Sequence, residues 1–322
     1  MINTQRQRFF SYSLLLSLLF VVVLMTFFLL FDKTAKGSQP ANQNYLPVRP
    51  NYYLGTDTPE VYYQNELAAS STALELLVNR SNANHIDRSA PVKGDLVVPI
   101  LMYHYIAPTP TNSPLPHLYT NPVIFEEQIR AIYDAGYNSV LVRDVGEALA
   151  GRKNLPVKPI VITFDDGYDD FYTTAVPILK KYGLRGTNYV IVDAVDKPGY
   201  MTKKQLVELG QNPNIEIASH TLNHPNLKET EEAQARVELQ DSKKRLAEII
   251  GRSVDDFAYP FGFFRDRDQK LCQEAGYLTC ASTYPGTKQT YHGRFTLYRL
   301  RPMYKVGDNL LQFINYKELA NK

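Results

Sequence analysis

The sequence of 322 residues contains no tryptophan, only two cysteines and almost no net charge. Two cysteines cannot make the disulfide-dense framework of a small secreted domain; a bridge between Cys272 and Cys280 and a pair of buried thiols both remain open. The 35 Lys and Arg residues are balanced by 33 Asp and Glu residues, so the chain lacks the basic field that nucleic-acid binding requires. A hydrophobic content of 44% excludes a disordered chain and allows a sizeable core.

Apolar residues are concentrated near the N-terminus, where residues 9–31 contain no charge, proline or glycine. A membrane-spanning helix needs about 20 such residues, whereas the apolar core of a cleaved signal peptide has about 7 to 15 and is followed by small residues. Asp32 and Lys33 follow here, which favours an uncleaved anchor over a cleaved signal. We therefore expect a short cytoplasmic head at residues 1–8, a single-pass anchor in the cell membrane at residues 9–31, and an extracytoplasmic remainder.

Residues 32–94 have the composition of an extracytoplasmic linker, because prolines recur among Asn and Ser residues. Residues 67–79 predict one helix within this linker. Paired tyrosines at 52–53 and 62–63 favour an arm that is partly packed on the following domain, and contact with sugar is the alternative.

From residue 95 onward, short β-branched runs alternate with amphipathic segments. The predicted strands are residues 97–103, 139–142, 159–164, 187–192, 215–219, 256–259, 278–282 and 296–300. The predicted helices are residues 125–135, 144–150, 173–182, 202–209, 229–250, 266–275 and 308–319. This alternation predicts an α/β fold, a distorted barrel of seven or eight β/α units in one domain of residues 95–322, with functional residues at the carboxyl ends of the strands.

The first polar cluster is TFDDG at residues 163–167, directly after a strongly apolar strand. Neighbouring carboxylates at a strand end point in different directions, so Asp165 and Asp166 can serve a substrate and a metal ion separately. An acidic turn or a calcium loop is the alternative, although the spacing does not match the twelve-residue loop of an EF-hand.

The second cluster is SHTLNH at residues 219–224, directly after another predicted strand. His220 and His224 have the i, i+4 spacing that lets two imidazoles converge on one ion. A single histidine is more often a packed or surface residue, but two at this spacing favour a metal site. With one Asp they make a two-His, one-carboxylate set, which is typical of a catalytic ion with open coordination positions.

TFDDG followed about fifty residues later by SHTLNH resembles the polysaccharide deacetylases of carbohydrate esterase family 4, which share the NodB-homology domain. Further matches are VPILMYH at residues 98–104, FEEQ at 125–128 and FAYPFG at 257–262. The resemblance implies a distorted barrel and metal-dependent removal of N-acetyl groups from glycans. It implies that Asp165 is the general base, and that Asp166, His220 and His224 hold the metal.

The resemblance also assigns an oxyanion-binding N–H to Phe261. It leaves gaps, because the arginine that orients the base in this family aligns with Ala258, and the motif with the family's tryptophan is missing. Arg299 or Arg143 can supply the charge instead. Tyr259, Phe261 and Tyr284 are candidates for the wall of the acetyl pocket.

The general acid of the family is usually a histidine near the end of the domain, but residues 297–301 read LYRLR. His104 is the predicted replacement, because this chain is similar to the poly-N-acetylglucosamine and exopolysaccharide subgroup, whose acid follows the first strand. The alternative is that His104 only packs against or caps that strand.

We thus expect a membrane-anchored hydrolase that uses a divalent ion, zinc, to remove N-acetyl groups from a β-linked N-acetylglucosamine polysaccharide, either peptidoglycan or an exopolysaccharide. One alternative is an O-acetyl ester deacetylase of a polysaccharide such as xylan, and another is an inactive glycan-binding surface protein. The expected partners are the polysaccharide and the membrane; the sequence identifies no protein partner.

Overall fold

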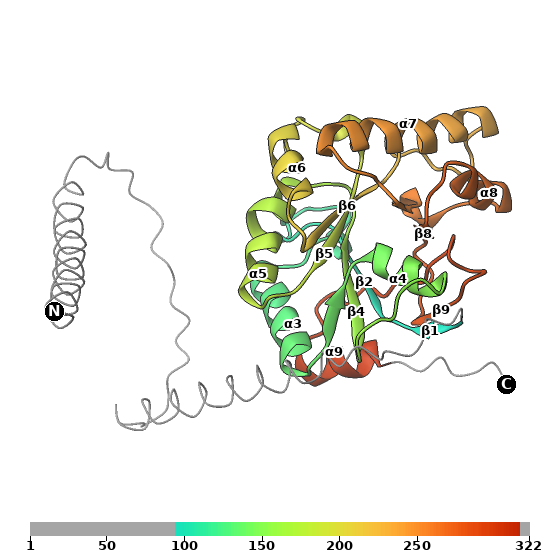
Figure 1. The fold of residues 1–322 in the computed structure, drawn as a ribbon. Helices are drawn as coiled ribbons and strands as arrows, with labels where there is room; N and C mark the ends of the chain where they lie inside the picture. The colour runs from blue at the N-terminus through green and yellow to red at the C-terminus, as the bar shows by residue number, and fades with distance from the viewer. Residues whose placement is uncertain (1–93, 316–322) are drawn as a thin grey trace, which may run out of the picture. The chain divides into compact units, whose positions relative to one another are not determined.

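The computed structural model describes residues 94–315, and these contain a parallel β-sheet surrounded by helices (Figure 1). The strands are β2 (Ile100–Tyr103), β4 (Pro159–Phe164), β5 (Gly186–Val190), β6 (Ile215–Ser219), β7 (Asp256–Ala258) and β8 (Thr279–Ala281), paired in that order. β3 (Asn138–Val140) pairs with the first half of β4. The expected head, anchor, linker and linker helix fall at residues 1–94, nearly all of them outside the described residues.

The sheet curls until its two edges are joined by residues 297–300, which we call the closing segment. Isolated parallel bridges link Leu297 to Ala281 on one side and Leu300 to Leu101 on the other. The Leu300 N–H donates to the Ile100 carbonyl, and the Met102 N–H donates to the Leu300 carbonyl, both at 2.8 Å. The predicted α/β class is therefore confirmed, and the curled parallel sheet fits the expected distorted barrel, although the expected strand at 296–300 consists of single bridges.

Helices pack on the outer side of the sheet, except for α4 (Val142–Leu149), which packs against the apolar residues of its inner face. The other helices are α3 (Pro122–Asp134), α5 (Val176–Lys181), α6 (Lys203–Gly210), α7 (Glu232–Ile250), α8 (Asp266–Glu274) and α9 (Gly307–Ile314). Shorter helical turns are η1 (Pro116–Leu118), η2 (Phe171–Ala175), η3 (Val192–Ala194) and η4 (Pro260–Gly262). Local signals set the ends: the Asn121 side chain accepts from the Val123 N–H before α3, and Gly251 ends α7 at φ 70°.

Side chains of each strand alternate between the inside of the curled sheet and the helix layer. Val161 and Tyr189 belong to the inner apolar cluster, whereas Ile160 and Phe164 belong to the outer one. Because both faces are buried, β2 (ILMY) and most of β4 (PIVITF) read as continuous apolar runs instead of alternating ones. Val161, Thr163 and Asp165 are alternate residues, so their side chains point to the same, inner face. The strand therefore directs Asp165 into the mouth of the barrel.

Helix α4 closes the opposite, amino-terminal end of the barrel. Val142, Val145 and Leu149 of this helix share the inner apolar cluster. Gly146 permits the close approach, since a Cβ there would lie 2.6 to 2.8 Å from side-chain atoms of Leu278 and Thr279. The barrel is therefore filled from below and open only at the end where the strands finish.

The described residues also contain a small second sheet and a disulfide. β1 (Leu96–Val97) pairs antiparallel with β9 (Lys288–Gln289), apart from the barrel. A disulfide joins Cys272 of α8 to Cys280 of β8, which decides between the bridge and the pair of thiols. Among residues 94–315, no helix combines the length and apolar character needed to cross a membrane.

Candidate active site

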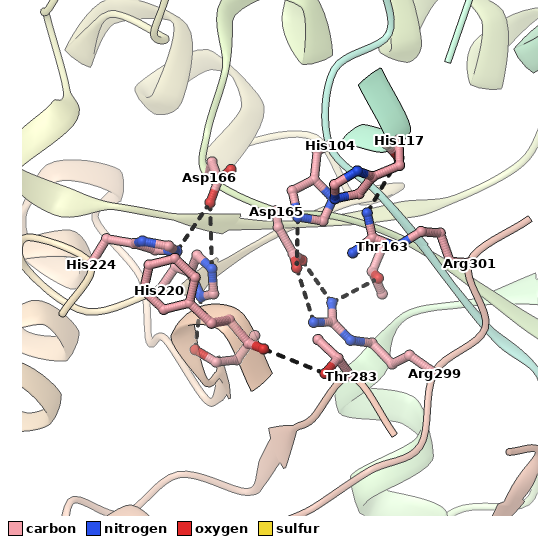
Figure 2. A network of polar contacts seen from close by, with 12 residues as sticks. His104, His117, Thr163, Asp165, Asp166, His220, His224, Thr283, Arg299 and Arg301 are labelled. Atoms are coloured by element: carbon pink, nitrogen blue, oxygen red, sulfur yellow. Dashed lines mark hydrogen bonds and ion pairs between the residues drawn. The ribbon is translucent and has the colours of Figure 1, made fainter. Parts of the chain in front are cut away.

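The predicted polar residues meet at the carboxyl end of the barrel (Figure 2). His104 follows β2, Asp165 and Asp166 follow β4, and His220 follows β6. Because these strands run parallel in one sheet, their carboxyl ends lie at the same edge, and residues distant in sequence come close together there.

Asp166, His220 and His224 form a compact cluster of candidate metal ligands. The Oδ1 atom of Asp166 lies 3.5 Å from Nε2 of His220 and 3.5 Å from Nε2 of His224. One ligand atom from each residue falls within 4.8 Å of the others. Nδ1 of His220 donates to the Ala258 carbonyl at 2.8 Å, so the lone pair on Nε2 faces Asp166.

The environment of this cluster fits a cation. Asp166 Oδ1 is buried and accepts no hydrogen bond, which leaves a costly unsatisfied oxygen. Burial and the charge of Asp165 raise the pKa of Asp166 to about 7, and burial lowers the pKa of His220 to about 3. Neutral imidazoles and a carboxylate without a cationic partner are the donor set that a divalent ion such as zinc accepts.

Several residues of the site have backbone conformations that side chains disfavour. Asp166 has φ 77°, Thr221 φ 69°, His224 φ 63° and Phe261 φ 59°. Each such non-glycine residue costs about 1–3 kcal/mol and persists only where neighbouring contacts impose it. One such contact is the Thr221 hydroxyl, which accepts from the His224 N–H at 2.9 Å. The strain is thus stored where the candidate ligands converge.

Asp165 is held by Arg299 from the closing segment. The guanidinium donates to both carboxylate oxygens, at 2.6 and 2.9 Å, and both side chains are almost fully buried. Burial alone would raise the pKa of Asp165, but the charge of Arg299 outweighs it and holds the pKa below its usual range. Of the two predicted arginines, Arg299 is the one beside Asp165; Arg143 contacts Glu216 through its backbone N–H.

His104 lies on the opposite side of Asp165 from the candidate metal ligands Asp166, His220 and His224, as Figure 2 shows. Its Nε2 atom is 3.8 Å from Oδ2 of Asp165, and its Nδ1 atom is buried without a hydrogen-bond partner. Burial lowers the pKa of His104 to about 4, although the charge of Asp165 opposes the shift. An imidazole in this place can exchange a proton with a group bound above Asp165.

Phe261 lies at the candidate site, whereas Tyr259 is turned away from it. Phe261 lies in the first turn of η4, where a helix offers no acceptor for the N–H, and its ring is 4.5 Å from the His224 ring. The Tyr259 side chain is fully buried on the helix side, where its hydroxyl donates to the Phe295 carbonyl at 3.0 Å. The expectation that Tyr259 lines the acetyl pocket is therefore wrong, because the strand parity turns it outward.

Two further residues at the site, Tyr168 and Arg301, are not predicted by the sequence motifs. The Tyr168 hydroxyl hydrogen-bonds to Asp166, and its ring stacks on Tyr105 with centroids 3.6 Å apart. Tyr168 also lines a hollow of about 270 Å³ beside Asp166 and His224, together with Lys197 and Tyr200. The signal for Arg301 is its i+2 spacing from Arg299, which puts both arginines on one face of an extended segment.

Comparisons with known proteins agree with this geometry. Residues 152–280 match the family model described as polysaccharide deacetylase. A putative polysaccharide deacetylase of Bacillus subtilis, YxkH, is 32% identical over 217 residues, which cover 67% of this chain and 75% of that protein.

Two further similarities concern named deacetylases. The poly-β-1,6-N-acetyl-D-glucosamine N-deacetylase of Escherichia coli K12 is 33% identical over 112 residues, which are 30% of this chain but only 17% of that protein. The structure of the Streptococcus pyogenes deacetylase PplD in complex with acetate has a TM-score of 0.63 and 31% identity, covering 70% of this chain and 100% of that one.

Proposed function

Because this chain belongs to the polysaccharide deacetylase family, we propose that it removes N-acetyl groups from a β-linked polysaccharide containing N-acetylglucosamine and releases acetate. The observation that carries the proposal is the pairing of an Asp166–His220–His224 cluster with a separately held carboxylate, Asp165. The name of the E. coli relative, a poly-β-1,6-N-acetyl-D-glucosamine N-deacetylase, supports an N-acetylated glycan as the substrate, and the S. pyogenes deacetylase is in complex with acetate, the proposed product.

Asp166, His220 and His224 would hold a divalent ion, and we propose zinc because one carboxylate and two imidazoles suit it. When bound, such an ion polarises the acetyl carbonyl and makes a coordinated water more acidic. Asp165 then takes the proton of the attacking water. Arg299 keeps both oxygens of Asp165 in place, so this carboxylate is oriented before the substrate arrives.

The charge that develops on the carbonyl oxygen needs a donor. The Phe261 N–H serves this purpose in the proposal, because it stands in the first turn of η4 beside His224. Asp165 passes the proton that it has taken from the water to His104, whose Nε2 atom lies 3.8 Å from Oδ2 of Asp165, and His104 donates a proton to the leaving amine. The reacting amide would therefore lie between His104 and the Asp166–His220–His224 cluster.

The experiment that tests this function measures acetate released from purified glycans by the zinc-loaded protein and by Asp165→Asn. The substrates are chitooligosaccharides, a poly-N-acetylglucosamine and cell-wall glycan. We expect release from at least one, and a fall of about 10²-fold or more in the variant, since Asn cannot accept the proton. Acetate release that survives the substitution would contradict the mechanism.

A second candidate is hydrolysis of an O-acetyl ester on a polysaccharide. The low pKa of His104 favours it, because an alkoxide leaves with less help from an acid than an amine does. The relative rates on amide and ester substrates separate the two. An inactive glycan-binding protein is the weaker alternative, since the candidate base and all three candidate ligands are present.

We also propose that residues 9–31 anchor the protein in the cell membrane and that the deacetylase domain faces outward. The support is the long apolar run in the sequence, which lies outside the described residues. An outward-facing domain would meet glycans at the cell surface.

A further inference from the structure

Arg301 stands beside the candidate active site and has no part in the chemistry proposed above. It follows Arg299 by two residues, so its side chain leaves the closing segment on the same face. Figure 2 shows its guanidinium on the side of His104 and His117, away from Asp166, His220 and His224. Its hydrogen bond runs from Nη1 to the His117 carbonyl at 3.3 Å.

This guanidinium is half-buried without a carboxylate partner. Within residues 94–315, no carboxylate lies within ion-pair distance of Arg301, whereas Arg185 pairs with Asp144 at 2.9 Å and Arg299 with Asp165 at 2.6 Å. A guanidinium has five N–H groups, and the single bond to a carbonyl uses one. A partly desolvated cation with unused donors is costly unless a ligand supplies the missing charge.

The charged groups around Arg301 do not supply the missing negative charge. Asp165 is the carboxylate that acts on Arg301 most strongly, but both of its oxygens are already held by Arg299. His104 is the other titratable group on this side, and it is an imidazole that burial keeps neutral. A divalent ion at Asp166 would neutralise that carboxylate as well. The His104 side of the site therefore carries excess positive charge.

We propose that Arg301 binds a carboxylate carried by the glycan, close to the acetamido group that is removed. The substrate class is then an acidic N-acetylated glycan in place of a neutral one. This inference rests on the proposed function. In that function His104 faces the leaving nitrogen, so a group near Arg301 belongs to the ring substituents next to this nitrogen and not to the acetyl methyl.

The test compares two glycans of equal length under the same conditions. One is a neutral N-acetylglucosamine oligomer, and the other carries a lactyl carboxylate on oxygen 3 of alternate sugars. Wild-type protein should have the higher kcat/KM on the acidic oligomer. In Arg301→Gln, the ratio of acidic to neutral kcat/KM should fall about ten-fold or more, mainly through KM, because a charge-assisted bond is lost. Arg301→Lys should recover part of the ratio.

Two control variants locate the effect. Lys197→Gln removes a cation at the hollow on the other side of Asp166, and Arg130→Gln removes an exposed cation on α3. Neither should change the ratio of acidic to neutral kcat/KM. A ratio that falls in Lys197→Gln but not in Arg301→Gln would place the carboxylate in the hollow and overturn the inference.

A second readout keeps this inference separate from the proposed function. Binding of the fully de-N-acetylated acidic oligomer is measured by calorimetry, and the affinity should be weaker for Arg301→Gln than for wild type. Absence of acetate release from every glycan would reject the proposed function, while the binding result would still decide the role of Arg301. Equal binding by the two proteins, or an Arg301→Gln variant that only resists inhibition by added acetate, would overturn it.

Discussion

Asp165 is a buried carboxylate whose position depends on one neighbour. Arg299 holds both of its oxygens, and a lysine could hold only one. We expect Arg299→Lys to lower kcat for acetate release by about 10²-fold, because small displacements of a catalytic group have costs of this size. The measurement is steady-state acetate release, with circular dichroism to show that the variant is folded.

A matched control is Arg143→Lys, because the backbone N–H and the charge of Arg143 act on Glu216 and not on Asp165. Its rate of acetate release should stay close to that of the wild type. If the two variants lose activity equally, the fall reflects general destabilisation and not the loss of the paired hydrogen bonds to Asp165.

His104 is the candidate acid, and its role depends on the leaving group. An amine needs a proton to leave, whereas an alkoxide needs it less, so His104→Ala should slow amide hydrolysis by about 10²-fold and ester hydrolysis by clearly less. Rates on an N-acetylated oligomer and on its O-acetylated counterpart make the comparison. An unchanged amide rate would remove His104 from the mechanism.

The sequence predicted which residues gather at the site better than how each one points. Asp165, Asp166, His220 and His224 come from short motifs at strand ends, and the structure brings them together. The outward turn of Tyr259 was not predictable, because residues 257–259 are apolar on both faces and carry no alternation. The choice between Arg299 and Arg143 also needed the structure, since both follow predicted strands.

Among the elements, β6 and β7 share a pair of buried acids at the lower end of the barrel. Glu216 and Asp256 act strongly on each other's pKa, Thr187 donates to Glu216, and Thr279 donates to Asp256. Burial and the neighbouring Glu216 raise the pKa of Asp256 well above its usual value. The folded protein therefore keeps a proton that the unfolded chain releases near pH 4.

This shift makes stability depend on pH in one direction. The stabilisation by the proton is complete below the unfolded pKa and is lost as the pH rises toward the folded pKa. Asp256→Asn removes this dependence, so from pH 5 to pH 9 the melting temperature of the wild type should fall relative to that of the variant. Asp255→Asn, the adjacent control, should keep the pH dependence of the wild type. Melting temperatures of wild type and Asp256→Asn that change in parallel with pH would contradict a proton retained at Asp256.

The predicted and observed boundaries of an element agree best where its sequence pattern is clear. β4 and β6 coincide with the predicted 159–164 and 215–219, because each is a short segment rich in isoleucine directly before a polar motif. The predicted helix 173–182 is divided into a π turn, η2, and a short α-helix, α5. Wider turns of this kind depend on tertiary packing around Phe171 and Ala175, which local propensity does not encode.

For the whole molecule, the N-terminal apolar run predicts where the protein resides. Cells that produce the full chain should contain it in the membrane fraction, because residues 9–31 are long enough to span a bilayer. Deletion of residues 1–31 should move the protein into the soluble fraction and leave acetate release intact. Full-length protein in the soluble fraction would contradict the anchor.

The closing segment also sets an order of assembly along the chain. The candidate metal ligands lie between residues 166 and 224, but the arginine that holds Asp165 arrives with residues 297–300, which join the two edges of the sheet. A ribosome adds about 5–20 residues per second, so the ligands leave it several seconds before this last segment. A chain interrupted before residue 297 would carry the ligands with an unheld base. We therefore expect Asp165 to be oriented only after residues 297–300 have joined the sheet, and a product truncated before residue 297 to release acetate more slowly than the full chain.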